Sequence, residues 1–167
     1  HLEGKGTSAL DVTGLAQKNG PVTSHVRIAQ RAEDLFATRI GDGSADLVIG
    51  CDPVVGTGFE ALSKLAKGRT VAVMNAHVTP TADFASDPDL DLSFDAMGAA
   101  VREATGNGNA HTLRATELAT ALMGDAIFTN PFLLGYAFQI GRLPVSLDAL
   151  HRAIELKRML REGVVYE

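Results

Sequence analysis

The chain has 167 residues, which is enough for one hydrophobic core and predicts a single domain over residues 1–167. Hydrophobic residues make up 46% of it and charged residues 21%, as in an ordinary soluble globular protein. The formal net charge of -5 excludes the basic surface of a nucleic-acid-binding protein, and no apolar run is long enough to span a membrane.

The first residues predict the end of a helix, because His1–Glu3 is followed by Gly4 and Gly6, and glycine commonly stops a helix. A domain seldom begins on a helix tail. We therefore expect a strand and a helix upstream of His1, which makes the chain a fragment of a longer polypeptide; an expression-tag remnant is the alternative. No signal peptide is visible, and we expect a cytoplasmic protein.

Two strands are predicted next, over Ser8–Thr13 and Val22–Ala29, with a polar loop between them. In the second strand the side chains alternate, so that Thr23, His25 and Arg27 share one face. Together with loop residues Gln17, Lys18 and Asn19, His25 and Arg27 supply hydrogen-bond donors suited to an anionic or carbonyl ligand. The alternative is a plain hairpin with one solvated face.

The middle of the chain alternates between strand and helix patterns. Short apolar runs predict buried strands, and leucines at helical spacing predict a helix between two of them. The expected elements are strands at Ala37–Ile40, Ala45–Gly50, Thr70–Met74 and Ala110–Arg114, and helices at Gly56–Lys67, Asp95–Ala104, Ala115–Leu122, Asn130–Gly141 and from an N-cap at Ser146 onward. The acidic segment Ser86–Asp95 is expected to be an irregular surface excursion.

This order predicts an α/β fold, a layered domain with a central parallel or mixed sheet. Ligands of such sheets gather beyond the carboxyl ends of the strands, where Cys51-Asp52 and Asn75-Ala76-His77 lie.

Several side chains can be weighed for chemistry. Cys51 with His77 can form a nucleophile and base, although an inert buried cysteine is commoner. The single cysteine excludes an internal disulfide and leaves no CxxC or CxxH motif for zinc or an iron–sulfur cluster. His25, His77 and His111 lack metal-ligand spacing, and no complete GxGxxG is present. These residues predict a domain with a polar ligand edge, and a stand-alone small-ligand or nucleotide-binding α/β module remains an alternative.

Four stretches carry a family resemblance, in the family's order along nearly the whole chain. They are Leu10–Ile28, Ala45–Asp52, Asn75–Phe84 and Asn130–Leu156, with Leu134-Gly135-Tyr136-Ala137-Phe138-Gln139 especially similar. They resemble the γ domain of 2-oxoacid:ferredoxin oxidoreductases, and most closely the large indolepyruvate ferredoxin oxidoreductase type. Departures are Asn19, where the family usually has glycine, the tail after Leu156, and the absence of the glycine-rich strand–turn–helix that opens the family's γ domain.

The resemblance implies a share in the oxidative decarboxylation of a 2-oxoacid, such as an aryl pyruvate, to an acyl-CoA. It implies that this domain alone binds no cofactor, and that thiamine diphosphate, Mg²⁺ and iron–sulfur clusters reside in other domains, which also pass electrons to ferredoxin. The expected partners are the thiamine-binding domains or subunits, coenzyme A and the 2-oxoacid. The residues expected to face substrate or coenzyme A are Gln17, Lys18, Asn19, Gly20, Ser24, His25, Arg27 and Asn75.

Overall fold

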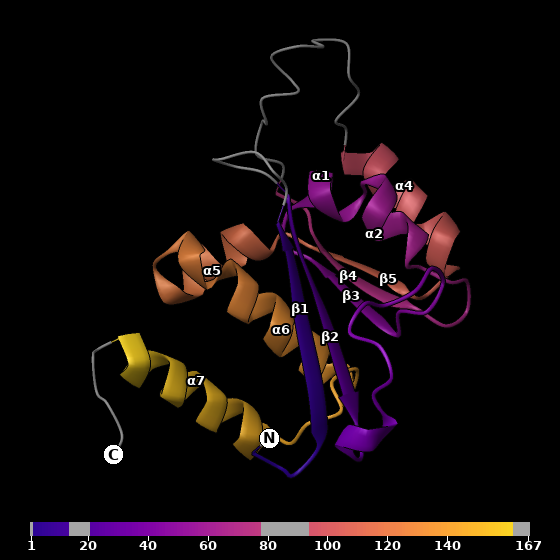
Figure 1. The fold of residues 1–167 in the computed structure, drawn as a ribbon. Helices are drawn as coiled ribbons and strands as arrows, with labels where there is room; N and C mark the ends of the chain where they lie inside the picture. Colours follow the sequence, from indigo (N-terminus) through magenta and orange to yellow (C-terminus); the bar gives the residue numbers. More distant parts are fainter. Residues whose placement is uncertain (1, 14–20, 78–93, 162–167) are drawn as a thin grey trace. The chain divides into compact units, whose positions relative to one another are not determined.

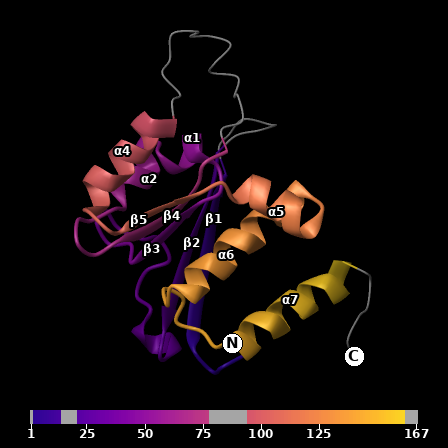
Figure 2. The same ribbon diagram turned by 180° about the vertical axis from the view of Figure 1, so that it is seen from behind.

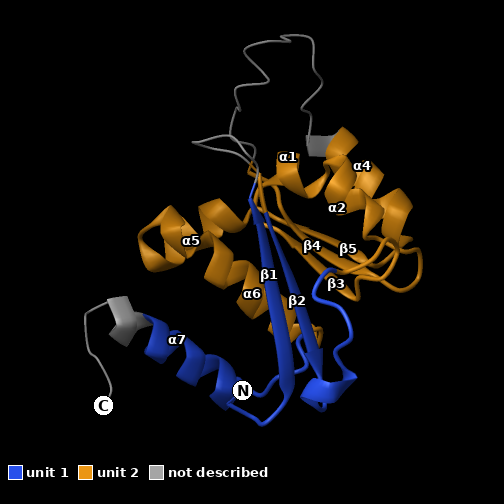
Figure 3. Cartoon of the chain, in the orientation of Figure 1, with its two compact units in different colours: residues 1–13, 23–39, 143–167 blue, residues 14–22, 40–142 orange. Residues whose placement is uncertain are grey.

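The computed structural model describes residues 2–13, 21–77 and 94–161. The chain comprises two compact units (Figure 3). The hairpin unit consists of His1–Thr13, Thr23–Arg39 and Leu143–Glu167, and the sheet unit consists of Gly14–Val22 and Ile40–Arg142. The predicted ligand loop Gln17–Gly20 and most of the acidic segment Ser86–Asp95 lie outside the described residues.

The sheet unit is built on three parallel strands, β3 (Leu47–Gly50), β4 (Val71–Asn75) and β5 (Ala110–Leu113), in the order β3-β4-β5. The register places Val48 beside Ala72 and Met74 beside Thr112. All five residues of β4 are buried, as expected of the middle strand of a parallel sheet. The predicted α/β fold with a parallel sheet is therefore confirmed.

Helices cover both faces of this sheet (Figures 1 and 2). One face carries α1 (Pro53–Gly56), α2 (Phe59–Ser63) and α4 (Phe94–Thr105), and the other carries α5 (Ala115–Met123) and α6 (Thr129–Gln139), joined by the 3-10 turn η2 (Ala126–Phe128). The helices that lead from β3 to β4 and from β4 to β5 lie on the same face. That follows because both crossovers advance in one direction across the sheet and share one hand.

The core of the sheet unit follows the alternation of β4. Ala72 and Met74 point toward α2 and α4, where they pack with Leu65 and Val101. Met74 lies over Gly56 of α1, and a Cβ added at Gly56 would lie 2.5 Å from the Met74 Cε atom. The absence of a side chain at Gly56 therefore gives the Met74 side chain the space that it occupies.

The hairpin unit contains β1 (Gly6–Thr13), β2 (Val22–Ala29), the 3-10 turn η1 (Ala32–Asp34) and α7 (Leu147–Arg161). β1 and β2 form a two-stranded sheet, and they pair antiparallel because the short connection between them cannot make a parallel crossover. The Glu3 carboxylate accepts a hydrogen bond from the Ser146 backbone N–H at 3.0 Å, and the Ser146 hydroxyl caps α7 by accepting from the Ala149 N–H at 3.2 Å. The predicted N-cap at Ser146 is confirmed.

Two predicted elements were wrong. The helix expected over Gly56–Lys67 is shorter, because α1 ends at Gly56, Gly58 is extended, and only α2 (Phe59–Ser63) lies within the expected range. Residues 37–40 form no strand. The expected helix end before Gly4 stays a prediction: Leu2 and Glu3 form a turn, and Gly4 adopts the left-handed φ of 70° that is common after a helix. Among the helices that the structure describes, none combines the length and the apolar character that a bilayer crossing requires.

Candidate functional site

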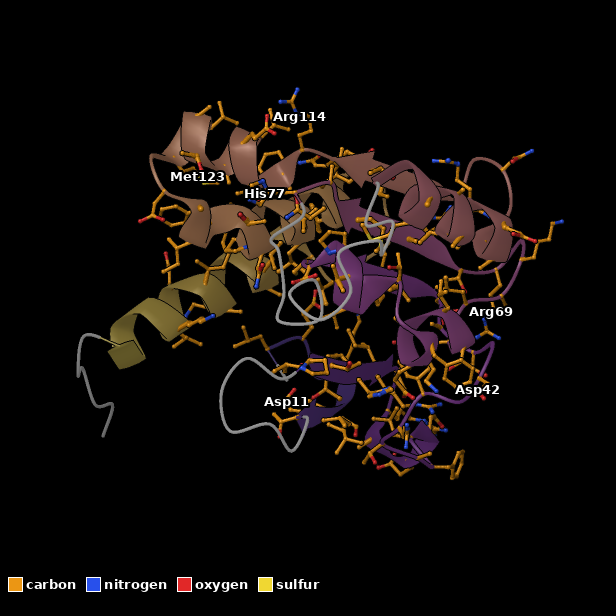
Figure 4. All side chains as sticks on the ribbon, turned by 90° about the horizontal axis from the view of Figure 1, so that it is seen from above. Asp11, Asp42, Arg69, His77, Arg114 and Met123 are labelled. Atoms are coloured by element: carbon orange, nitrogen blue, oxygen red, sulfur yellow. The ribbon has the colours of Figure 1, made fainter. Side chains whose placement is uncertain are left out.

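The carboxyl edge of the three-stranded sheet carries the residues that the sequence placed there. Cys51 and Asp52 follow β3, Asn75 is the last residue of β4, and His77 comes shortly after it. His77 and Arg114 lie at this edge, whereas Asp42 and Arg69 lie at the opposite one (Figure 4). The candidate site of the sheet unit is therefore the edge formed by the ends of β3, β4 and β5.

Asp52 serves as the N-cap of α1. Its Oδ1 atom accepts hydrogen bonds from the backbone N–H groups of Val54 at 2.8 Å and Val55 at 3.3 Å. Pro53 occupies the first position of the helix, where its missing N–H costs nothing. The carboxylate thus satisfies the helix terminus that would otherwise attract an anion.

Asn75, at the end of β4, forms hydrogen bonds to the residue after β3 and to α5. It is 3% exposed, and its Nδ2 donates to the Cys51 carbonyl at 3.0 Å and to the Thr116 hydroxyl at 2.9 Å. Its Oδ1 accepts from the His77 backbone N–H at 3.3 Å. Both ends of the amide are therefore engaged by protein groups, which fixes the end of β4 relative to β3 and α5.

The network continues into the helices behind the sheet. The Thr129 hydroxyl lies 3.3 Å from the Thr116 hydroxyl and donates to the Ala126 carbonyl at 2.6 Å. Beside Asn75, on the other face, is a small depression of about 10 Å³, room for about one water. It is lined by Pro53, Thr57, Met74, Asn75, Met97, Gly98, Val101 and Thr112. This part of the edge is closely packed.

The hypothesis that Cys51 acts as a nucleophile finds little support at this edge. Burial, together with the charge of Asp52, raises the pKa of the Cys51 thiol, which lowers the thiolate fraction at neutral pH.

His111, one of the histidines considered as metal ligands, is hydrogen-bonded to another side chain. Its Nδ1 lies 3.0 Å from the Tyr136 hydroxyl, and the two rings pack edge to face. Within the described ranges, no three His, Cys, Asp or Glu side chains are grouped to hold a metal ion.

The second strand of the hairpin unit carries three of the predicted ligand-facing residues. The Ser24 hydroxyl donates to Asp11 of β1 at 2.6 Å. His25 is buried at 2% exposure, whereas its neighbour Val26 is 55% exposed. Arg27 is half-buried, and its Nη1 donates to the Arg39 carbonyl at 3.3 Å. The strand therefore buries the imidazole and presents a valine outward.

The predicted ligand-facing residues are thus distributed over both units. Ser24, His25 and Arg27 belong to the hairpin unit and Asn75 to the sheet unit, while Gln17, Lys18, Asn19 and Gly20 lie outside the described residues. Sequence reasoning missed Thr116, Thr129 and Tyr136. Their partners are distant in sequence, and Asn75 and Thr116 are 41 positions apart, so no local pattern signals the contact.

Comparison with known families decides the assignment. A family model described as pyruvate ferredoxin/flavodoxin oxidoreductase matches residues 1–166. The chain belongs to this family. No curated protein matches the chain. Membership in this family favours a role within a 2-oxoacid:ferredoxin oxidoreductase over a stand-alone binding module. It also indicates that the chain is part of a multidomain or multisubunit enzyme.

Proposed function

We propose that the chain is the γ domain of an indolepyruvate-type 2-oxoacid:ferredoxin oxidoreductase. The observation that carries the proposal is the family match over residues 1–166. In the overall reaction an aryl pyruvate and coenzyme A give an acyl-CoA and carbon dioxide, and the released electrons reduce ferredoxin. The indolepyruvate type is supported by the resemblance of the stretches around Leu10–Ile28 and Asn75–Phe84.

The cysteine ligands of an iron–sulfur cluster are not present in this sequence. An iron–sulfur cluster needs several cysteine ligands, and the sequence has only Cys51. Grouped acidic or histidine side chains for a metal ion are also absent from the described part of the chain. We therefore propose that thiamine diphosphate, Mg²⁺ and the clusters are held by other domains or subunits of the same enzyme, and that these also contact ferredoxin.

The role of this chain within the enzyme is then structural packing and a share in ligand approach. The guanidinium of Arg27 has five N–H donors, and its bond to the Arg39 carbonyl occupies one of them. The others suit a phosphate of coenzyme A or the carboxylate of the oxoacid. A cytoplasmic location is supported by the single cysteine, since the fold uses no disulfide.

The direct test is to purify the complete natural polypeptide or complex that carries this sequence. We expect it to contain iron and to reduce ferredoxin in a reaction that requires both coenzyme A and a 2-oxoacid, with indolepyruvate giving a higher kcat/KM than pyruvate or 2-oxoglutarate. An iron-free protein without an iron-bearing partner contradicts the redox assignment. Activity that prefers pyruvate contradicts only the indolepyruvate type.

The ligand-facing role of Arg27 predicts a kinetic effect. In the complete enzyme, Arg27→Ala is expected to raise the KM for coenzyme A or the oxoacid about tenfold, the effect of one lost charge-assisted hydrogen bond, with little change in kcat. The matched control is Arg31→Ala, which removes an exposed arginine of the same unit that pairs with Asp34. Equal kinetics for the two variants contradict the assignment of Arg27.

A further inference from the structure

The outer face of α5 and of the turn η2 that follows it is exposed and apolar. Across residues 117–128, every residue except Ala119 is exposed. The large hydrophobic side chains in this stretch are Leu118, Leu122, Met123, Ile127 and Phe128. Leu122 is 72% exposed and Ile127 62%. A group of exposed apolar side chains of this size marks a surface that contacts another protein.

The sequence of α5 gives the helix two distinct faces. Ala115 and Ala119, four residues apart, are fully buried against the rest of the sheet unit. Leu118 and Leu122 are also four residues apart and share the outer face, with Ala121 beside them. The small alanine leaves a groove between the leucines in which a side chain of a facing helix can fit. The outer face is therefore suited to packing against a second helix.

The charges at the two ends of α5 have opposite signs, and neither suits its own helix end. Arg114, the N-cap residue, points outward at the start of the helix (Figure 4), and Asp125 follows the left-handed Gly124 that ends it. The helix dipole favours the reverse arrangement. Arg114 pairs with Glu117, and Asp125 accepts a hydrogen bond from the Ile127 N–H at 2.9 Å. These ends suit a neighbour with the opposite distribution of charge.

A second α5 that runs antiparallel to the first has that distribution. Arg114 comes four residues before Leu118. Asp125 comes three residues after Leu122, so the charges and the leucines are arranged nearly symmetrically about the middle of the helix. A two-fold axis through this point places Leu118 beside Leu122 of the partner subunit. The same axis places each end charge beside an opposite charge and beside the helix end that favours it.

We propose that two copies of this chain contact each other through α5, antiparallel and about a two-fold axis. Leu118, Ala121 and Leu122 pack against the same residues of the partner subunit. Arg114 forms an ion pair with Asp125 of the partner subunit, and the symmetry makes a second pair at the other end. An unrelated partner would account for the exposed leucines, but not for opposite charges at nearly equal distances from them.

The size of this contact decides how it can be detected. Two facing nine-residue helices bury less than the roughly 1,200 Å² of a stable interface. The α5 pair is therefore one contact within a larger assembly of the oxidoreductase, and the oligomeric state alone does not report it. A measurement local to α5 is required.

Photo-cross-linking on the complete oxidoreductase supplies that measurement. A diazirine-bearing leucine analogue is placed at position 122, in enzyme assembled from isotopically labelled and unlabelled copies, and the adducts are sequenced. We expect an adduct with residues near Leu118 of the partner subunit. The control carries the analogue in place of Phe59, which is 88% exposed on α2, and is expected to give no adduct between copies. An adduct with a different domain or subunit, an adduct within one copy, or no adduct at position 122 overturns the proposal.

Charge reversal tests the predicted register of the two helices. Arg114→Glu and Asp125→Arg are each expected to lower the adduct yield about fivefold or more, because each places like charges at both ends of the contact. The double variant should restore the yield, whereas Asp125→Asn, which can still cap η2, should lower it less than Asp125→Arg.

The restoration reports a contact between copies and not one within a copy. Along one α5 the two charges are on the order of 15 Å apart at 1.5 Å per residue, beyond the Debye length of about 8 Å at physiological ionic strength. Unchanged yields in both single variants, or a double variant that is no better than the single variants, overturn the predicted pairing.

Discussion

At the scale of single residues, Gly6 shows how closely two backbones approach in the hairpin unit. Gly6 is buried at the start of β1, and a Cβ built there would lie 2.5 Å from the Arg31 carbonyl carbon and oxygen and 2.6 Å from the Ala32 Cα. All three neighbours are backbone atoms, which cannot rotate away as a side-chain end can. Only glycine fits this crossing of β1 and the segment before η1.

Gly6→Ala is therefore expected to destabilise the protein. Overpacking of this kind costs about 1–3 kcal/mol, because the strand or the turn must shift. Urea unfolding measures the change. The control is Gly135→Ala in α6, where an added Cβ meets nothing within 4 Å and alanine gains up to about 1 kcal/mol of helix propensity. A Gly6→Ala variant as stable as the original protein contradicts the close approach.

Cys51 gives a second expectation at this scale, and the single cysteine makes the measurement unambiguous. Because burial and the neighbouring Asp52 charge raise the pKa of the thiol, the thiolate fraction at neutral pH is small. Iodoacetamide is expected to alkylate the folded protein several times more slowly than it alkylates free cysteine, and the rate should rise in urea. Alkylation faster than that of free cysteine would revive the nucleophile hypothesis.

At the scale of elements, Lys64 joins α2 to the turn before β3. The side chain is buried, and its Nζ donates to Asp42 at 2.6 Å and lies 3.3 Å from a Glu60 oxygen. The hydrogen bond to Asp42 raises the pKa of Lys64 against the opposing effect of burial. The contribution of the pair to stability is therefore complete below the unfolded pKa of about 10.4 and is lost as the pH rises through the higher folded pKa.

Asp42→Asn is expected to lower the free energy of unfolding by less than about 1 kcal/mol, since the Asp42 carboxylate is largely exposed and screened. Unfolding measured from neutral to alkaline pH should show the difference from the original protein shrinking above about pH 10.4. The control Asp46→Asn breaks the exposed pair with Arg69, in which the cation is an arginine and not a lysine. The same alkaline trend in both variants contradicts the Lys64 assignment.

Elements with strong periodicity were predictable from the sequence, and those decided by distant contacts were not. The apolar runs at Leu47–Gly50 and Val71–Asn75 form the expected strands. The helix expected over Gly56–Lys67 is reduced to α2, because Gly58 is extended and separates α2 from α1, a backbone conformation that leucine spacing does not reveal. Phe59, the first residue of α2, is 88% exposed.

At the scale of the whole molecule, the family could be predicted from motifs spread along the sequence. The hydrogen bonds of the candidate site could not. The strand ends were expected to hold Asn75 and Cys51, and they do. The hydrogen bonds that engage Asn75 come from α5 and from the end of β3, which no spacing predicts. Alternation in β2 assigned His25 and Arg27 to one face but could not tell which face is buried.

The close packing around Met74 has a consequence for the oxidation of the protein. The side chain is 4% exposed, and added Cβ atoms at Gly50 and Gly56 would both meet it. A sulfoxide oxygen would place a polar group in an apolar core. Oxidation at Met74 therefore requires that α1 first move away from the sheet. The rate at which peroxide oxidises this sulfur then reports how often the core opens.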